Sequence, residues 1–346
     1  MKKLVSVIIP VYNTKEQFEE CLKSVIEQKY REIEIIIVDD GSEAEIASWY
    51  DSKIVLDNRI RIKHIRNGGV SRARNVGLEI AKGDLCMFVD SDDMIFPDAV
   101  SSLVQLVDRA DTNVLGCASY TRENPCGYDV SPKVDEIMCT KKEMIAYLSS
   151  YKRACNNIHF LNSNTSSFFL SVWGKLYNID VIKKNNIKFD EDIFLYEDML
   201  FNLKYLNCIN NATLSSKIIY YYRDNIESAT HQFTMRQYSN VLNVLEKLKK
   251  EKMRLIFCNI LYLLSADIVR CNPKMQSIYI EKYSEFVNQN ESFLRECTSE
   301  IKAIESKSER LFVSLLINKK IRTAFFSLRF YSFVKNIHIC SLNIRK

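Results

Sequence analysis

Three carboxylates crowd the stretch MFVDSDD at residues 87–93. Asp90, Asp92 and Asp93 follow an apolar run that is typical of a buried strand. Two unit charges about 4 Å apart repel by roughly 4 kcal/mol at an effective dielectric constant near 20, so three such groups need to point into water or to share a cation. This stretch alone is consistent with a solvated acidic turn and with a site for a divalent cation.

The acidic stretch is one of four polar clusters that follow apolar runs. The patterning predicts strands over 5–10, 33–40, 60–65 and 85–90, and helices over 15–28, 43–52, 71–81 and 97–109. Such alternation predicts a mostly parallel α/β sheet with helices on both faces. Ligands of these sheets bind beyond the carboxyl ends of the strands. There the sequence places residues 10–13, 39–42, 67–69 and 90–93.

Weaker patterns follow this first half. We expect a strand near 113–120, a helix over 174–186, a loop that leads into a helix over 194–206, and a strand over 218–223. From about residue 232 onward the sequence has the pattern of helices and almost no Gly or Pro. It therefore predicts a catalytic domain over 1–235 and a helical C-terminal region over 236–346.

The clusters lack the common nucleotide-binding fingerprints. Neither G-x-G-x-x-G nor G-x-x-x-x-G-K-[ST] occurs, and PVYNT stands where a nucleotidyltransferase would carry its glycine-rich loop. Instead, a basic glycine turn, RNGGVSRARN, lies between two acidic clusters. Carboxylates that gather a cation near arginines at a helix start suit a metal-bridged diphosphate, and a more remote carboxylate can accept the imide N–H of uracil. This pattern favours a nucleotide-sugar site.

Four motifs together carry a family resemblance. VSVIIPVYN, IIIVDDGS, NGGVSRARNVGL and MFVDSDD, in this order and spacing, resemble the inverting family 2 glycosyltransferases with the GT-A fold. Residues 172–201 resemble the second half of that domain in bacterial surface-polysaccharide members. The resemblance covers roughly residues 4–235. It implies a Rossmann-like nucleotide-diphospho-sugar transferase domain, and it does not extend to the all-α C-terminal region.

The resemblance implies roles for residues that would bind the donor. Pro10 and Tyr12 would line the base pocket, and Asp40 would accept the uracil imide N–H with Asp39 beside it. The remaining donor contacts are expected from Asn67, Arg72, Arg74, Asn75 and Asp90.

The resemblance also implies a cation site and a base. Asp92, Asp93 and His231 would hold Mn²⁺ or Mg²⁺. Asp198, paired with Glu197, would deprotonate the acceptor hydroxyl. Trp173 and Lys175 would contact the acceptor, although Gly174 stands where related sequences usually have Asn.

Each assignment has a plainer alternative. Tyr12 is compatible with ordinary packing, and Asp39 with an N-cap of the following helix. The two arginines also fit a solvated helix face, and the acids at 197–198 fit a first helical turn. His231 is compatible with a surface residue. His64, in the third expected strand, is expected to be structural.

Composition narrows the cellular setting. Eleven cysteines without a C-x-x-C pair argue against a disulfide framework or a zinc site and favour a reducing, cytoplasmic compartment. No apolar run reaches the length of a membrane span. The N-terminal MKKLVSVIIPVYNT is interpreted as a buried strand, because Tyr12 and Asn13 interrupt the apolar stretch that a signal peptide would need.

The C-terminal tail carries the positive charge. Residues 310–346 hold eight Lys and Arg and no acid, whereas the rest has 40 Lys and Arg against 43 Asp and Glu. Two apolar stripes recur at helical spacing, one at Ile321, Phe325 and Leu328, the other at Phe326, Phe330 and Phe333. This pattern fits a helix on the anionic inner face of the cell membrane, which would make the protein a peripheral one. The alternative is a helix packed on the protein.

The resemblance, together with the residues of the polar clusters, thus implies a metal-dependent, inverting glycosyltransferase of the hexosyl or N-acetylhexosaminyl class. It would move a sugar from a nucleotide-diphosphate donor, a UDP-sugar, to a hydroxyl of a saccharide or lipid-linked saccharide in capsule or lipopolysaccharide synthesis. A polyprenyl-phosphate sugar synthase and a non-catalytic nucleotide-sugar-binding module are the alternatives. Nucleic-acid binding is not supported, because the basic residues do not surround an aromatic platform. A homo-oligomer is compatible with the sequence.

Overall fold

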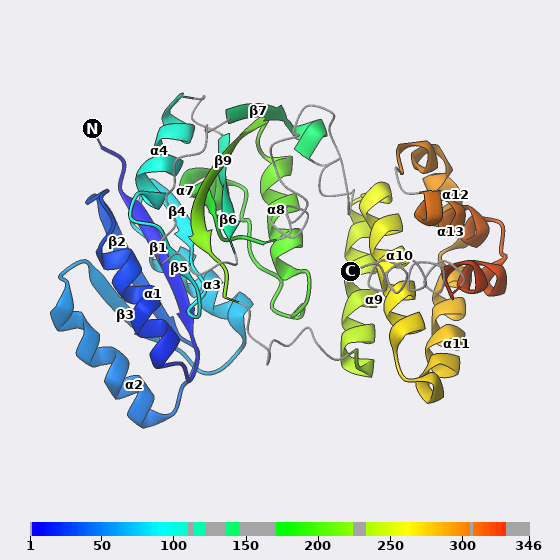
Figure 1. Ribbon diagram of the computed structural model, residues 1–346, viewed down its shortest axis with the longest axis horizontal. Helices are drawn as coiled ribbons and strands as arrows, with labels where there is room; N and C mark the ends of the chain where they lie inside the picture. The colour runs from blue at the N-terminus through cyan, green and yellow to red at the C-terminus, as the bar shows by residue number, and fades with distance from the viewer. Residues whose placement is uncertain are drawn as a thin grey trace, which may run out of the picture. The chain divides into compact units, whose positions relative to one another are not determined.

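The computed structural model describes residues 2–109, 114–121, 136–144, 171–223, 233–304 and 307–329. These residues form two compact units (Figure 1), one up to residue 223 and one from residue 233 onward. The predicted metal ligand His231 lies outside the described residues, as do residues 330–346 of the tail.

Four parallel strands form the N-terminal half of the first unit. They are β1 (Val5–Val11), β2 (Ile33–Asp39), β3 (Ile60–His64) and β4 (Leu85–Phe88). β1 lies between β2 and β4, in a register that pairs Val5 with Ile33 and with Leu85. Runs of Val and Ile suit this arrangement, because β-branched side chains pack well on a sheet that is covered on both faces. The parallel strands expected from the sequence are confirmed here.

Helices connect these strands. They are α1 (Glu16–Ile26), α2 (Ala44–Asp51), the short helical segment η1 (Ser52–Leu56) and α3 (Val70–Ile80). A further helix, α4 (Ala99–Arg109), follows β4 in the chain and leads to the second half of the sheet. Right-handed crossovers place α3 on the opposite face of the sheet from α1 and α2 (Figure 1). α3 lies close to β1, since a Cβ at Gly77 would come within 2.4 Å of Ile8.

The second half of the sheet is mixed. Its elements are β5 (Met94–Ile95), β6 (Val114–Thr121), β7 (Glu136–Thr140), β8 (Lys175–Asn178), α7 (Ile179–Lys184), α8 (Glu197–Asn207) and β9 (Asn211–Tyr221). The strand order is β3-β2-β1-β4-β8-β6-β9-β5, with β7 paired to β9. β8 is antiparallel to both β4 and β6. The helix expected over 174–186 is therefore wrong for its first third, which is this central strand.

Aromatic side chains fill the core between β4 and α8. The ring of Phe88 lies edge-on to Tyr177, Phe189 and Phe201, at centroid distances of 5.8, 5.3 and 5.8 Å. Phe189 stacks on Phe201 at 4.1 Å. This apolar cluster fixes the start of α8 relative to the carboxyl end of β4.

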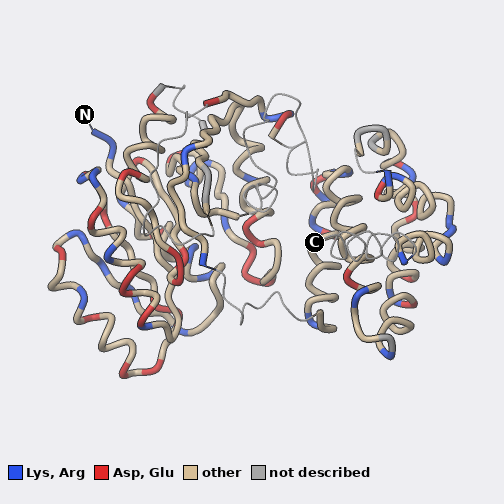
Figure 2. The backbone as a smooth tube through the Cα atoms, in the orientation of Figure 1, with Lys and Arg blue, Asp and Glu red and all other residues tan. Residues whose placement is uncertain are grey.

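The described part of the second unit is helical, as expected. It contains α9 (Met235–Lys250), α10 (Arg254–Arg270), α11 (Pro273–Gln289), α12 (Glu291–Glu296), η2 (Cys297–Ala303), α13 (Lys307–Ile317) and a helical run over 321–329. Local signals start these helices: Thr234 and Gln237 form a capping box, and Asn272 caps a helix that opens with Pro273. Figure 2 shows Lys and Arg dispersed over the helices.

The two apolar stripes of the tail have different surroundings. Phe325 and Leu328 are buried, and the Phe325 ring contacts Tyr283 at 5.2 Å and Phe312 at 6.0 Å. The packing alternative therefore holds for this stripe. Phe326 of the other stripe is 69% exposed, and its partners at 330 and 333 lie outside the described residues. Among the helices that the structure describes, none is long and apolar enough to span a bilayer.

Candidate active site

An ion-pair cluster joins segments that lie far apart in the sequence. The Arg74 guanidinium, on α3, donates from Nη1 to Asp198 Oδ1 at 2.7 Å and from Nη2 to Asp90 Oδ1 at 2.8 Å. Glu197 Oε1 lies 3.6 Å from Nη1. Four of the residues singled out in the sequence thus meet at the carboxyl end of β4. Glu197 and Asp198 also form the first turn of α8, so both interpretations of this acidic pair are compatible with the structure.

The Asp198 carboxylate is held from two sides. Its second oxygen, Oδ2, accepts from the backbone N–H of Val172 at 3.1 Å. Burial raises the pKa of Asp198 to about 7, although the Arg74 charge opposes the shift. A carboxylate with a pKa near the working pH suits a general base, because it is partly ionised and still basic enough to take a proton.

Buried side chains fix the loop that carries Val172. Lys175 Nζ donates to Ser171 O at 2.7 Å, and Asn202 Nδ2 donates to the same oxygen at 2.8 Å. Lys175 is 1% exposed, and burial lowers its pKa to about 8. Lys175 therefore lies inside the protein and fixes this loop, so the structure does not place it for the acceptor contact expected from the sequence.

Trp173 and Asn75 are also buried. The Trp173 ring stacks on Tyr220 at 4.6 Å and is 5% exposed. The Asn75 carboxamide accepts from Phe189 N at 2.8 Å and donates to Phe189 O at 3.0 Å and to Glu191 Oε1 at 3.1 Å. Both side chains thus hold neighbouring segments in place, and ligand contacts by them stay predictions.

Asp40 holds the basic glycine turn. Its Oδ1 accepts from Gly68 N at 2.8 Å and its Oδ2 from Gly69 N at 2.7 Å, while Asn67 Nδ2 donates to its backbone oxygen at 2.9 Å. Gly69 has a φ of +90°, which favours glycine. The Arg72 side chain lies so close to Gly68 that a Cβ there would come within 2.4 Å of it. The turn after β3 is therefore fastened to the end of β2.

Asp39 pairs with a histidine that the sequence did not connect to it. Asp39 is 1% exposed, and its Oδ2 lies 2.7 Å from His64 Nδ1. His64 Nε2 lies 3.0 Å from Asp51 Oδ1. Burial disfavours the charged imidazole, but these two hydrogen bonds outweigh it and raise the pKa of His64. The N-cap alternative for Asp39 is wrong, since Glu43 occupies the cap position of α2.

Asp93 points into the protein. It is 1% exposed, and its two oxygens accept from Tyr220 OH at 2.7 Å and from Arg223 N at 2.8 Å. Burial and the charges of Asp90 and Asp92 raise the pKa of Asp93 to about 8. Tyr220 also accepts from Asp90 N at 3.2 Å, so it positions the acidic turn. Tyr220 lies on β9, where a strand over 218–223 was expected, but the sequence does not show that its ring faces this turn.

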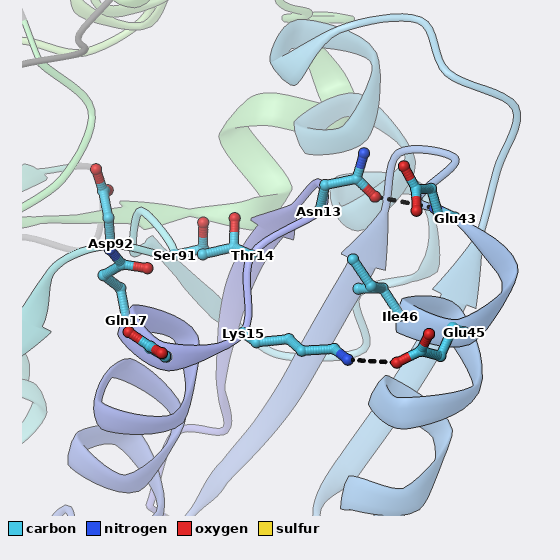
Figure 3. Close-up of a pocket in the computed structure, with 10 residues that line it drawn as sticks. Asn13, Thr14, Lys15, Gln17, Glu43, Glu45, Ile46, Ser91 and Asp92 are labelled. Carbon is cyan, nitrogen blue, oxygen red and sulfur yellow. Dashed lines mark hydrogen bonds and ion pairs between the residues drawn. The ribbon is translucent and has the colours of Figure 1, made fainter.

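Asp92 lines a polar hollow of about 570 Å³ (Figure 3). The hollow lies between the segments that follow β1, β2 and β4, and its lining includes Glu16, Glu43 and Glu45. Glu45 pairs with Lys15 at 3.0 Å. Among the described residues no three acidic, His or Cys side chains form a ready cation cage. One carboxylate beside open space nevertheless fits Mg²⁺, which takes most of its ligands from water and phosphate.

The two residues expected at the base pocket lie at the end of β1. Pro10 is buried within the strand, and Tyr12 follows it with 52% of its surface exposed. Asn13, next to it, has a φ of +48°, an uncommon conformation that turns the chain toward α1. An exposed aromatic ring beside a polar hollow is available to a flat ligand, so the packing alternative for Tyr12 is not favoured.

Comparison with known proteins settles the family. The profile described as Glycosyl transferase family 2 matches residues 6–171. The glycosyltransferase GlyG of Streptococcus pneumoniae is 31% identical over 62% of this chain and 71% of its own length. The chain belongs to glycosyl transferase family 2. EpsJ of Bacillus subtilis is 33% identical over 66% of this chain and 64% of its own length.

A solved structure confirms the GT-A fold of this family 2 chain. Staphylococcus aureus TarS 1–349, solved with UDP-GlcNAc, superposes with a TM-score of 0.67 at 20% identity, over 95% of this chain and 91% of that one. The curated TarS, a poly(ribitol-phosphate) beta-N-acetylglucosaminyltransferase, is 30% identical over 62% of this chain and 35% of its own length. At 20% identity the superposition establishes the fold and not the substrates.

Proposed function

We propose that this family 2 glycosyltransferase moves a sugar from a UDP-sugar to a hydroxyl of a saccharide or lipid-linked saccharide in cell-surface polymer synthesis, with inversion at the anomeric carbon. The cluster of Arg74, Asp90 and Asp198 carries the proposal, because it brings a candidate base to the sheet edge where ligands of this architecture bind. TarS, whose solved structure contains UDP-GlcNAc, supports a UDP-linked donor.

Asp198 acts as the general base. Its pKa of about 7 leaves a substantial ionised fraction at neutral pH. The carboxylate takes the proton of the acceptor hydroxyl, and the oxygen attacks the anomeric carbon from the face opposite the diphosphate. The bond from that carbon to the diphosphate oxygen breaks as the new bond forms, so the configuration inverts. Such proton transfer contributes about 10²–10⁴-fold to the rate.

The donor lies across the ends of β1, β2 and β4. Tyr12 packs against the uracil, and the turn held by Asp40 borders the ribose. Asp92 would hold Mg²⁺ or Mn²⁺, and a cation there would supply positive charge for the leaving diphosphate. Direct contacts by Arg72, and a ligand role for His231, remain part of this proposal.

Replacement of the base tests the proposal. Asp198→Asn should lower transfer from UDP-GlcNAc or UDP-glucose to a saccharide acceptor at least 10²-fold, because the amide takes up no proton. The UDP dissociation constant, measured by calorimetry with Mn²⁺, should change less than threefold. Asp180→Asn, an exposed acid in the first turn of α7, is the matched control.

Three outcomes would contradict the proposal. If Asp198→Asn still transfers sugar, Asp198 is not the general base. A protein that binds UDP but neither transfers sugar nor slowly hydrolyses the donor would be the non-catalytic binding module. Transfer to a polyprenyl phosphate, without transfer to any saccharide hydroxyl, would instead establish the polyprenyl-phosphate sugar synthase.

We also propose that the second unit binds the anionic cytoplasmic face of the membrane. Phe326 is exposed on a helix that carries Arg322 and Arg329. The remaining aromatic residues of that stripe and three further cations follow in the sequence. Lipid-linked acceptors would be concentrated at that surface.

A further inference from the structure

Arg74 is too deeply buried to act as an ordinary phosphate-binding arginine. Its side chain is 4% exposed, and the guanidinium lies 5.4 Å from the centroid of the Phe189 ring. Two of its nitrogens donate to Asp198 and Asp90 at 2.7 and 2.8 Å. A donor phosphate would have to displace a carboxylate to reach these nitrogens. Direct donor contact by Arg74, as expected from the sequence, is therefore not the role that the geometry favours.

The charges around Asp198 leave Arg74 as its main stabilising partner. The described residues give Asp198 one ion-pair partner, Arg74. Glu197 and Asp90 face the same guanidinium with negative charge. From β8, the buried ammonium of Lys175 and the Tyr177 phenol also act on the carboxylate. Three carboxylates thus share one guanidinium, and the state of each affects how strongly the other two are held.

We infer that Arg74 is a positioning residue that keeps the Asp198 carboxylate ionised and oriented, and that it does so through its bonds to Asp198 and Asp90 without touching the donor. This inference rests on the proposed role of Asp198 as the base. Nη1 fixes one oxygen of Asp198 while Val172 N fixes the other. The bond from Arg74 to Asp90 connects the Asp198 carboxylate to the end of β4, where the donor is proposed to bind. Arg74 therefore fixes the position of the base relative to the donor site.

The inference makes predictions of opposite sign for two neighbours of Asp198. Arg74→Gln removes the cation, and an opposite charge at this distance shifts a carboxylate pKa by about 1–3 units, so the Asp198 pKa should rise. Glu197→Gln removes a negative neighbour and frees the guanidinium for Asp198, so the Asp198 pKa should fall. Arg74→Lys keeps the positive charge but cannot donate to Asp198 and Asp90 with the geometry of a guanidinium. The Asp198 pKa in this variant should lie between the values in the wild type and in Arg74→Gln.

Carbon-13 NMR of aspartate side chains measures the pKa of Asp198 directly, without any substrate. The Asp198 signal is assigned by its loss in Asp198→Asn, and its titration midpoint is then followed in each variant. Lys204→Gln is the matched control, because Lys204 also lies on α8 but pairs with Asp190. Its midpoint should equal that of the wild type. An unmoved midpoint in Glu197→Gln overturns the inference even if Arg74→Gln does not fold.

Binding and rate measurements separate the two roles of Arg74. UDP affinity with Mn²⁺ should change less than threefold in Arg74→Lys, while the acid limb of the pH–kcat profile for transfer moves to higher pH. Loss of UDP binding with an unmoved Asp198 midpoint would make Arg74 a donor ligand and overturn the inference. If the midpoints shift as expected but Asp198→Asn still transfers sugar, the proposed function fails while the role of Arg74 toward Asp198 stands.

Discussion

Asp39 and Asp40 are adjacent acids at the end of β2, yet their surroundings differ. Asp40 accepts two backbone N–H groups of the turn after β3, whereas Asp39 faces His64. Both side chains are at least 95% buried. The family resemblance attributes ligand contacts to these two acids. Both can instead affect the site indirectly, through the backbone and the side chain that they hold in place.

Replacement of Asp40 tests this interpretation. Asp40→Asn should lower the free energy of unfolding by about 1–3 kcal/mol, because an amide cannot accept both N–H groups with the strength of a carboxylate. Urea denaturation of the variant measures the loss, with Asp180→Asn as the surface control. Unchanged stability together with lost UDP binding would show that Asp40 contacts the donor directly.

Replacement of Asp92 tests the cation site. Asp92→Asn should raise the Mn²⁺ concentration needed for half-maximal UDP binding at least tenfold, because the only change is the loss of one anionic oxygen at the hollow. UDP titrations at several Mn²⁺ concentrations measure it. Glu43→Gln, which alters another acid of the same hollow, should leave the Mn²⁺ requirement near that of the wild type. Equal effects of both changes would indicate a diffuse electrostatic influence.

At the scale of elements, His64 connects three of them. Its ring bridges Asp39 at the end of β2 and Asp51 at the end of α2, while its own backbone belongs to β3. The connection depends on pH, because both ring nitrogens can donate only when the imidazole is charged. It therefore links proton binding to the packing of α2 against the sheet.

The pH dependence of stability tests this link. Because the folded pKa of His64 is raised, its stabilisation should be fully present below the usual value of about 6.5 and should disappear as the pH rises through the folded pKa. The imidazole is 40% exposed, so solvent screening limits the effect to less than about 1 kcal/mol. Urea midpoints at pH 5.5 and 8.5 should differ less in His64→Gln than in wild type; an equal difference in both would contradict the link.

Local sequence pattern predicts some elements of this fold and not others. β1, β2 and α1 follow from runs of Val and Ile and from apolar residues at helical spacing, since their burial follows from these periods alone. β8 has four residues and leads directly into α7, so its pattern continues that of the helix. What makes it a strand is the pairing with β4 and β6, which no local pattern contains. The polar clusters of the site could be predicted because each directly follows a strand with a local apolar pattern. The burial of Arg74, Asn75 and Lys175 could not be predicted, because it depends on segments that are distant in the sequence.

At the scale of the whole molecule, the tail contributes to the core of the second unit and also carries the surface proposed to bind the membrane. Phe312, Phe325 and Leu328 form part of the core of the second unit. A deletion that begins at residue 310 would therefore remove core side chains, and a membrane test needs finer changes. Phe326, which is exposed, and the residues after 329 are the suitable targets.

The membrane proposal predicts lipid-dependent binding. Phe326→Ser combined with removal of residues 330–346 should lower binding to phosphatidylglycerol vesicles at least tenfold, because it removes exposed apolar surface and cations that each contribute about 1 kcal/mol near an anionic surface. Vesicle sedimentation at rising salt measures it. Val55→Ser, at an 87% exposed apolar residue of the first unit, is the control. Binding that is absent at low salt, or equal in both variants, would contradict the proposal.

The position of β8 between β4 and β6 has a consequence for synthesis on the ribosome. Ninety residues separate Phe88 from Asn178, which corresponds to roughly 5–20 s of translation. During that interval the edge of β4 that later pairs with β8 has no partner strand, and an unpaired apolar edge can associate with other chains. α8 emerges later still, so the bond between Arg74 and Asp198 becomes available only after β8 has been synthesised. A nascent chain therefore gains the proposed base only after β8 is available to pair with β4 and before β9 completes the sheet. On this proposal, products truncated before α8 would keep the ends of β1, β2 and β4 but would lack Asp198.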